Sequence, residues 1–456
     1  MSPSFRTLQN PERRAILTDS QPRSFILSQK KIDSKEVVSR IFGPAGKAKP
    51  SSMDQEQLSS LLGHGQKKPS LKTGSSQKPD LSKRFVLWGG WENEFGGIDI
   101  GSDSIKFVLL GQDGRRLRLK DVQIEKLTRL GNDAKPEDRD QEILNGLLKI
   151  ASRAKGKGKV RVGVSLNDPT LYTEWVSVPR GSEVELRESV RKELSEKHLI
   201  DPGATFFDFT KSDNGSSSAE QELFVVASPK ELVYHQFEMV QGAGFKLLNV
   251  ETNALASFYA LKRAARWERS ERILILDVGF RCSNLSIVTD DQLRFNRIIP
   301  IAGERFTKEI QNHLGINFDE AERLKMKHGL TGGREGETES QSVSQILFNE
   351  VDKLISEVER SFQFAFSKEA GEEGRKIDGM YLIGGGARLK GFRQYLEKRW
   401  EAPVREADIW EGLSFDERDI EPDFLSEVRD LSSAAIGLAL CITEWKVLPF
   451  GLGMPG

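Results

Sequence analysis

The chain has 456 residues, with 67 Lys and Arg against 68 Asp and Glu and a formal net charge of −1. This length leaves room for two to four domains with a large buried core, and no run of apolar residues approaches the ~18–20 needed to cross a bilayer. Two cysteines, Cys282 and Cys441, exclude a disulfide framework and suit a reducing cytoplasm. No His/Cys cluster has the spacing of a zinc site, and we expect no nucleic-acid partner.

Residues 1–90 differ in charge from the rest of the chain. They carry sixteen Lys and Arg against seven Asp and Glu, a net +9, which leaves −10 for residues 91–456. The segment is rich in Ser, Lys, Gln, Pro and Gly and has no sustained hydrophobic period, so it is predicted to be a mostly disordered extension. Two interpretations stay open: a solvated linker, or a weak contact with an anionic membrane or an acidic partner.

From Phe95 to Leu110, the sequence FGGIDIGSDSIKFVLL predicts a β-hairpin with a polar tip. Two apolar strands, 95–101 and 104–111, flank the turn. A carboxylate at the end of the first strand, next to glycine, hydroxyls and a lysine, suits a phosphate with its metal ion, because N–H groups and hydroxyls hold phosphate oxygens while the carboxylate holds Mg²⁺ through water. Polar tips are also common in ordinary hairpins, so this interpretation needs a partner loop. Its candidate residues are Asp99, Gly101, Ser102, Ser104 and Lys106.

The next elements alternate between helix and strand patterns. We expect a strand at 117–127, a helix at 137–154 and strands at 159–166 and 171–178. A compact α+β unit follows and is predicted to be inserted in a larger α/β domain. It contains a helix (183–199), two strands (205–210 and 222–228) and a second helix (230–243), and the strand 246–251 comes after it.

The segment 272–301 repeats the pattern of the first hairpin. An apolar strand ends at Asp277, Gly279 follows in the turn, and a second apolar strand comes next. The same D-x-G therefore recurs 178 residues after Asp99, at the same strand–turn position. This recurrence predicts duplicated halves whose loops clamp a phosphate chain from both sides, each carboxylate reaching one metal ion through water.

The last third of the body is mainly helical. Helices are expected at 304–314 and 318–328, and in the second of them Glu322 and Lys325 share one face. A long helix (342–368) precedes a buried strand from Ile377. The strand leads into Gly384, Gly385 and Gly386, which permit close backbone approach to a flat ligand or a phosphate. Further helices are expected from near Leu389 and at 431–442.

These motifs, in this order, resemble the actin-like ATPase superfamily, which includes actin, hexokinase, MreB and FtsA. They are D-x-G-S-x-S-x-K (99–106), D-x-G (277–279), AERLK (321–325) and LIGGGARLKGF (382–392). Within the superfamily, the stretch 222–256 and the inserted unit are most similar to the type IV pilus assembly protein PilM family. The resemblance covers about 95–445 and implies a two-lobed actin-like α/β fold with an inserted FtsA/PilM-type α+β subdomain.

The resemblance also implies a division into segments and a set of site residues. The segments are the extension 1–90, the first lobe 95–170, the inserted subdomain 171–245, the rest of the actin-like domain 246–445 and a tail 446–456. ATP would lie between the lobes, with Mg²⁺ held through water by Asp99 and Asp277. The implied nucleotide-binding residues are Asp99, Gly101, Ser102, Ser104 and Lys106 in the first phosphate loop, Asp277 and Gly279 in the second, Glu322 and Lys325 near ribose and adenine, and Gly384, Gly385 and Gly386 behind the base.

The implied function is that of a cytoplasmic ATP-binding scaffold in type IV pilus assembly. It would recruit a bitopic inner-membrane protein of the PilN type through that protein's short N-terminal peptide, and so lie next to the inner membrane. Other pilus components and further copies of the chain, in an oligomer or ring, are also conceivable partners. The alternatives are an FtsA-like division protein, a small-molecule kinase of the same fold, and a scaffold that binds no nucleotide.

The second loop departs from the family pattern. Phe280 and Arg281 stand where small and hydroxyl residues are usual. Phe280 would serve as a core residue, and Arg281 would either meet a phosphate or face solvent. No catalytic residue is assigned, because Glu251 and Glu304, the two that could position water, are both expected at the surface. We therefore expect ATP binding with weak or no hydrolysis.

Overall fold

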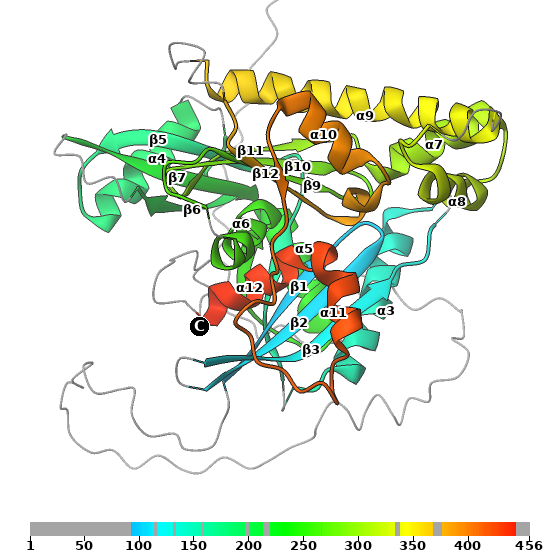
Figure 1. The fold of residues 1–456 in the computed structure, drawn as a ribbon. Coiled ribbons are helices and arrows are strands. Elements are labelled where there is room, and N and C mark those ends of the chain that lie inside the picture. Colours follow the sequence, from blue (N-terminus) through cyan, green and yellow to red (C-terminus); the bar gives the residue numbers. More distant parts are fainter. Residues whose placement is uncertain are drawn as a thin grey trace, which may run out of the picture. The chain divides into compact units, whose positions relative to one another are not determined.

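The computed structural model describes residues 93–443, except 114–115, 131–133, 157–158, 197–199, 213–218, 266, 333–337 and 368–375. The basic extension 1–90 and the tail 446–456 lie outside the described residues. In the described part, the named strands form three sheets, two with five strands and one with three (Figure 1). None of the described helices combines the length and apolar character that a membrane crossing needs.

The first lobe is built on a five-stranded sheet in the order β3-β2-β1-β4-β8. Strands β1, β2 and β3 form consecutive antiparallel hairpins, whereas β4 and β8 pair in parallel with β1 and with each other. Helices α3 and α5 bury their apolar residues against this sheet. The bounds are β1 (Asn93–Ile100), β2 (Ser104–Asp113), β3 (Arg116–Lys126), α3 (Pro136–Arg153), β4 (Arg161–Leu166), α5 (Lys230–Gly242) and β8 (Lys246–Thr252).

The second lobe repeats this topology. Its sheet has the order β11-β10-β9-β12-β13, again with three antiparallel strands followed by two parallel ones. The duplication inferred from the recurring D-x-G is therefore present in the topology. The bounds are β9 (Ile273–Val278), β10 (Ser283–Thr289), β11 (Gln292–Ile299), α7 (Gly303–Leu314), α8 (Phe318–His328), α9 (Thr338–Ala365), β12 (Gly379–Ile383), α10 (Phe392–Trp400) and β13 (Val404–Arg405).

Two helices link the lobes at close range. α6 (Asn253–Ala264) packs against strands of both five-stranded sheets, and α12 (Ser433–Thr443) packs against α6 and the first sheet. Glycines permit this approach: a Cβ on Gly437 would lie 1.8 Å from the Ala256 carbonyl oxygen, and one on Gly97 would lie 1.8 Å from the Ala435 carbonyl oxygen. The backbone of α12 is therefore in direct contact with α6 and β1, and α6 continues the packing to the second sheet.

A small unit interrupts the first lobe. Its three strands are antiparallel in the order β5-β7-β6, and α4 covers one face through Leu186, Val190 and Leu194. The helix α5, which the sequence analysis assigns to this unit, buries Val233 and Val240 in the core of the first lobe instead. The bounds are β5 (Tyr172–Pro179), α4 (Glu183–Glu196), β6 (Thr205–Lys211) and β7 (Glu220–Pro229).

Most element expectations agree with the structure, and the differences have local causes. The helix expected from near Leu389 begins at Phe392, because the glycines lead into a short 3-10 helix (Gly385–Arg388) and Gly391 takes a left-handed φ of 80°. The long helix begins at Thr338 rather than Ser342 and ends at Ala365. α6, β13 and α11 (Pro422–Val428) were not expected.

Candidate functional site

The two D-x-G loops lie on one pocket between the lobes. Its volume is about 410 Å³, within the range of small-molecule sites. Every residue that the resemblance implies as nucleotide-binding lines this pocket, although the two loops come from different lobes. Those residues are Asp99, Gly101, Ser102, Ser104, Lys106, Asp277, Gly279, Glu322, Lys325, Gly384, Gly385 and Gly386. Their shared location is a structural finding, and their role as nucleotide ligands stays a prediction.

The first loop places a lysine against a buried carboxylate. Asp99 and Lys106 are cross-strand partners in β1 and β2, and Lys106 Nζ lies 3.3 Å from Asp99 Oδ2. Lys106 also donates to the Ser104 carbonyl oxygen. A Cβ on Gly101 would lie 2.7 Å from Lys106 Nζ, so a larger residue there would displace the lysine. The lysine end could move aside, but a Cβ would also lie 2.9 Å from the Ser104 backbone carbonyl oxygen, so glycine is favoured at this turn.

The second loop closes in the same way as the first. The Gly101 N–H donates to the Ser104 carbonyl oxygen at 3.1 Å, and the Gly279 N–H donates to the Cys282 carbonyl oxygen at 3.1 Å. A Cβ on Gly101 would lie 2.9 Å from the Ser104 carbonyl oxygen, and a Cβ on Gly279 would lie 2.8 Å from the Cys282 carbonyl oxygen. The duplicated sequence thus produces duplicated loop geometry, with an aspartate two residues before each glycine.

The two aspartates influence each other across the pocket. Burial raises the pKa of Asp277 to about 6, the negative charge of Asp99 adds to the rise, and Lys106 opposes it. Two carboxylates held near each other beside one lysine leave an excess of negative charge, which a divalent cation would neutralise. Among the described residues no three His, Cys, Asp or Glu side chains gather as a direct metal cage. This donor set fits an ion held through water, as Mg²⁺ prefers.

A chain of polar side chains connects the two loops behind the pocket. Asp99 Oδ1 accepts hydrogen bonds from Ser165 Oγ at 2.8 Å and from Asn253 Nδ2 at 3.4 Å. Asn253 Oδ1 in turn accepts from Asn284 Nδ2 at 3.5 Å, and Asn284 is the cross-strand partner of Asp277. Sequence reasoning missed Ser165, Asn253 and Asn284 as a group, and no local signal joins residues so far apart in the chain.

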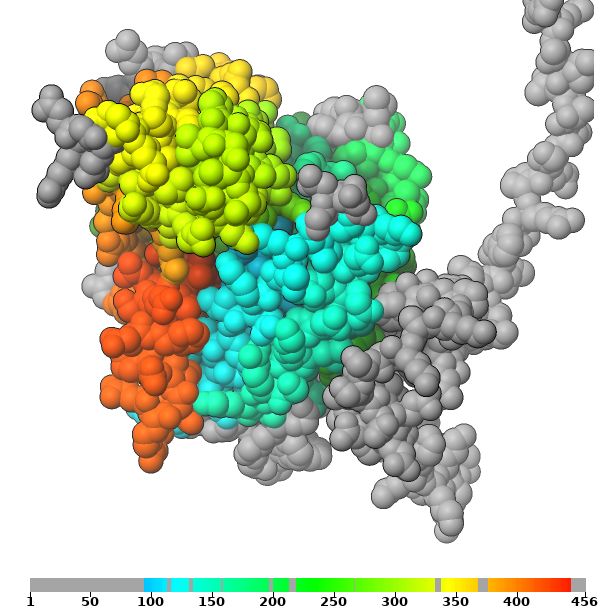
Figure 2. All heavy atoms as spheres, turned by 90° about the vertical axis from the view of Figure 1, so that its right-hand side faces the viewer, coloured from blue at the N-terminus to red at the C-terminus, as the bar shows by residue number. Residues whose placement is uncertain are grey.

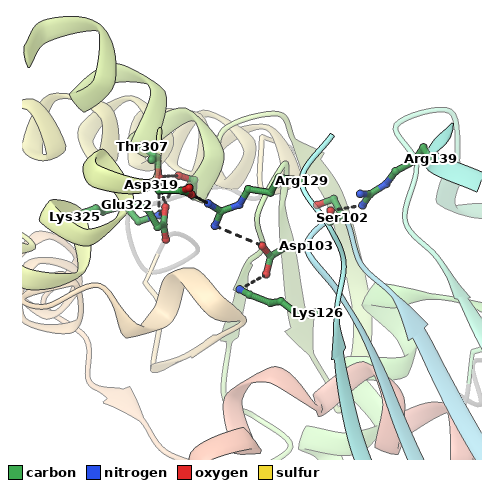
Figure 3. Close-up of polar contacts among 10 residues, drawn as sticks. Ser102, Asp103, Lys126, Arg129, Arg139, Thr307, Asp319, Glu322 and Lys325 are labelled. Carbon is green, nitrogen blue, oxygen red and sulfur yellow. Dashed lines mark hydrogen bonds and ion pairs between the residues drawn. The ribbon is translucent and has the colours of Figure 1, made fainter. Parts of the chain in front are cut away.

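A second polar cluster lies where α8 meets the pocket. Lys325 Nζ donates to Glu322 Oε2 at 2.8 Å, to Thr307 Oγ1 at 2.9 Å and to the Gly303 carbonyl oxygen at 3.2 Å (Figure 3). Thr307 Oγ1 also contacts Glu322 Oε2 at 2.5 Å. Burial lowers the pKa of Lys325, and the charge of Glu322 opposes that shift. The cluster fixes Glu322 at the pocket wall.

The glycine triplet approaches the second loop. Gly384 has a φ of 84°, a conformation that side chains other than glycine rarely adopt. A Cβ there would lie 2.3 Å from Asp277 Oδ1, and one on Gly386 would lie 2.3 Å from Val278 Cγ1. Gly384 and Gly386 therefore permit the loop after β12 to lie directly against Asp277 and Val278.

The unusual residues of the second loop are at the pocket edge. Phe280 is not a core residue, because it is only half-buried and packs edge-on against Phe318 with ring centroids 6.3 Å apart. Arg281 lies 3.5 Å from Glu304 and lines the pocket. The expectation that Glu251 is a surface residue is wrong: it is 3% exposed, and it is not among the described residues that line the pocket.

Comparisons with known proteins show the family of the chain and a shared fold. A model of the family described as type IV pilus assembly protein PilM matches residues 97–442. A solved structure of a PilM-PilN type IV pilus biogenesis complex superposes with a TM-score of 0.64 at 22% identity, covering 76% of this chain and 97% of that one. At this identity the superposition shows a shared fold.

Curated relatives come from cell division. Cell division protein FtsA of Helicobacter pylori strain J99 is 25% identical over 215 residues, 42% of this chain and 42% of that protein. FtsA of Borreliella burgdorferi is 25% identical over 236 residues, 48% of this chain and 54% of that protein. The chain spans about half or less of the length of these curated relatives.

The family model covers most of the chain, and the two-lobed actin-like α/β fold expected from the resemblance is confirmed. The chain belongs to the type IV pilus assembly protein PilM family.

Proposed function

We propose that this chain binds ATP with Mg²⁺ between its lobes and acts as a scaffold in type IV pilus assembly. The observation that carries the proposal is the matched pair of loops on one pocket, each with an aspartate on the strand and a glycine closing the turn. Two loops of the same geometry on opposite lobes suit a chain of phosphates, which presents similar oxygens to both sides.

Each side of the pocket offers different chemistry to a nucleotide. Backbone N–H groups of the two loops, the Ser102 hydroxyl and Lys106 would hold the phosphates. Asp99 and Asp277 would hold Mg²⁺ through water, and the ion would offset the charge of the phosphates. Glu322 and Lys325 would meet the ribose and adenine, and the glycines 384–386 would lie behind the base.

The polar environment favours binding over rapid hydrolysis. Glu304 is paired with Arg281 and also lies 2.9 Å from Lys308, so its charge is already neutralised. Glu251 lies outside the described pocket lining. Neither glutamate is placed to activate water, and the proposed activity is therefore nucleotide binding with weak or no turnover.

A pair of lysines in the same sheet provides a matched test of nucleotide binding. Lys106 pairs with Asp99 in the pocket, and Lys120 pairs with Glu94 at 2.7 Å outside its lining. Titration of a fluorescent ATP analogue with Mg²⁺ into the full chain should show Lys106→Ala binding about tenfold more weakly, or worse, because a phosphate contact is lost. Lys120→Ala should bind like wild type. Failure of the unmodified chain to bind would favour the nucleotide-free scaffold.

We further propose that a PilN-type protein is the partner. Family membership supports this, because a relative has been solved as a PilM-PilN complex. The partner's N-terminal peptide would lie beside the inserted unit, where Tyr234 is 51% exposed and packs edge-on against Phe206 of β6. Through this partner the chain would lie next to the inner membrane.

Variants of two exposed aromatic residues distinguish specific binding of the peptide from nonspecific adhesion. Fluorescence anisotropy should show a labelled PilN-type N-terminal peptide binding the full chain and losing affinity with Tyr234→Ala. Phe364→Ala is the control, since Phe364 is also exposed but lies on α9 in the second lobe. Equal loss in both variants, or in neither, would contradict a site beside the inserted unit.

The basic extension adds a separate proposal about membranes. With a net charge of +9, residues 1–90 would bind anionic vesicles weakly and in a salt-sensitive manner. Co-sedimentation of the full chain with anionic vesicles should fall as salt rises and should be lost when residues 1–90 are deleted. Equal binding without them would assign the segment to a solvated linker.

A further inference from the structure

Arg129 bridges the two lobes on the side of the pocket away from α6 and α12. It follows β3 of the first lobe, and its Nη1 donates to Asp319 Oδ1 of α8 at 2.8 Å across 190 residues of sequence (Figure 3). Its guanidinium carbon lies 4.7 Å from the centroid of the Phe318 ring and 5.7 Å from that of Phe280. One side chain thus makes an ion pair and two cation–π contacts with the opposite lobe.

The same arginine is connected to the first phosphate loop. Arg129 Nη2 lies 3.9 Å from Asp103 Oδ1, and Asp103 sits in the loop between Gly101 and Ser104. Lys126 Nζ holds the other oxygen of Asp103 at 2.8 Å, and the Leu127 N–H donates to the Asp103 carbonyl oxygen at 2.9 Å. The phosphate loop is therefore connected through Asp103 to the residues around Arg129.

On the other lobe, Arg129 meets the face of α8 that borders the pocket. Asp319 comes three residues before Glu322, so the two side chains share one helix face. Arg129, Glu322 and Lys325 all line the pocket. A ligand that contacts the first loop at one end and Glu322 at the other would cross from the first lobe to α8, as the Arg129 side chain does. Figure 2 shows this side, with the cyan part of the first lobe directly below the yellow-green part of the second.

These contacts also account for the bulky residue in the second loop. Phe280 supplies one of the two aromatic rings under the guanidinium, and its edge-on contact with Phe318 holds the rings next to each other. A small or hydroxyl residue at position 280 would remove that ring.

We propose that Arg129, with Asp103, Phe280, Phe318 and Asp319, forms a latch that closes the pocket and controls how fast a nucleotide leaves it. The latch rests on the proposed nucleotide function of the pocket. On the other side of the pocket α6 packs against strands of both five-stranded sheets, so the lobes open on the latch side. Arg129 acts as a positioning residue that restrains the lobes.

The latch is built to release. The Asp319 side chain is 81% exposed and that of Arg129 is 35% exposed, so salt screens their attraction. The aromatic contacts depend less on salt, so they keep the latch partly effective when the ion pair is weakened. Nucleotide release is therefore expected to accelerate at high salt in the wild-type chain.

The first experiment measures release from the full chain. A fluorescent ATP analogue bound with Mg²⁺ is chased with excess ATP in a stopped-flow instrument. Arg129→Ala should release it about tenfold faster, the factor that an ion pair with stacking provides, and its release should depend less on salt than that of the wild type. Arg129→Lys should restore part of both effects. Arg153→Ala is the matched control, because Arg153 pairs with Glu125 inside the first lobe. Unchanged release in Arg129→Ala would overturn the latch.

The second experiment first detects the contact between the lobes without nucleotide and then measures its effect on the analogue. The double variant Arg129→Cys/Asp319→Cys is treated with a short bismaleimide, and each single variant serves as a control for reaction at the native cysteines. A crosslink that forms only in the double variant shows that the two positions meet in solution, and the crosslinked chain should then neither release nor take up the analogue. No crosslink would refute the latch. If the crosslink forms but the wild-type chain binds no analogue, the proposed nucleotide function is refuted. The control of release is then refuted with it, and Arg129 is only a structural bridge between the lobes.

Discussion

Asp99 and Asp277 occupy equivalent positions in two duplicated hairpins. Burial raises the pKa of Asp277 to about 6, and the negative charge of Asp99 contributes to this rise. An isolated carboxyl would be fully ionised far below that value. The pocket therefore contains one carboxyl that takes up a proton only slightly below neutral pH. That proton would remove a charge that the proposed Mg²⁺ needs.

This relationship predicts a pH dependence. A raised pKa means that Asp277 becomes protonated as the pH falls through about 6, so Mg-ATP affinity should fall from pH 7.5 to pH 5.5, by up to about tenfold per unit below the pKa. The measurement is calorimetric affinity across this range. Asp277→Asn should bind weakly and show only the pH dependence of ATP itself. Parallel curves for variant and wild type would show that Asp277 does not couple to the ligand.

Adjacent glycines provide a prediction with an internal control. In Gly384→Ala the new Cβ would meet Asp277 Oδ1 at 2.3 Å in a backbone with φ of 84°, whereas in Gly385→Ala the nearest atom is 3.7 Å away. Gly384→Ala should weaken Mg-ATP binding and lower the free energy of unfolding by about 1–3 kcal/mol. Gly385→Ala should leave the free energy of unfolding close to that of wild type. Thermal unfolding of both variants checks the stability difference and nucleotide titration checks the binding loss in Gly384→Ala; equal loss of stability in the two variants would contradict the close approach seen at Gly384.

Removing the buried charge of Glu251 should stabilise the folded chain in a pH-dependent manner. Burial raises its pKa to about 8, and nearby Asp208 adds to the rise, while the Thr252 N–H lowers it. The unfolded chain ionises Glu251 near its ordinary pKa, so between that value and pH 8 the folded chain binds the extra proton and stability falls as the pH rises. Glu251→Gln keeps an acceptor for the Thr252 N–H and removes this cost.

The expected gain for Glu251→Gln is about 1–2 kcal/mol at pH 8 and close to zero at pH 4.5. Denaturant unfolding at the two pH values measures it. Glu188→Gln on α4 is the control, because that side chain is 71% exposed. A gain of the same size at both pH values would show that charge burial is not its cause.

Local sequence was sufficient to predict the two loops, because each is a strand, a turn and a strand within a few residues. The aspartate, glycine and lysine of the first loop are neighbours in the chain, so their pattern can be recognised without knowledge of the fold. The duplicated topology then follows from the repeated motif. The glycine turn and the pair Glu322–Lys325 were found for the same reason.

What the sequence did not show depends on contacts between distant segments. Asp99 meets Asn253 across 154 residues, and Arg129 meets Asp319 across 190, so no short window contains either pair. The helix α6, which carries Asn253, was missed because it is buried on nearly all sides and therefore lacks the polar face that reveals an amphipathic helix. Glu251 was placed at the surface because glutamate is rarely buried, and only the fold brings Asp208 near it.

The central claim, that both loops hold one nucleotide, is tested most directly by calorimetric titration of Mg-ATP into the full chain, Asp99→Ala, Asp277→Ala and the double variant. If both carboxylates reach one metal ion, each single variant weakens binding by about tenfold or more, and the double variant loses less than the sum of the two free-energy losses because the shared ion is already lost. Unchanged affinity in both single variants would contradict the two-loop clamp.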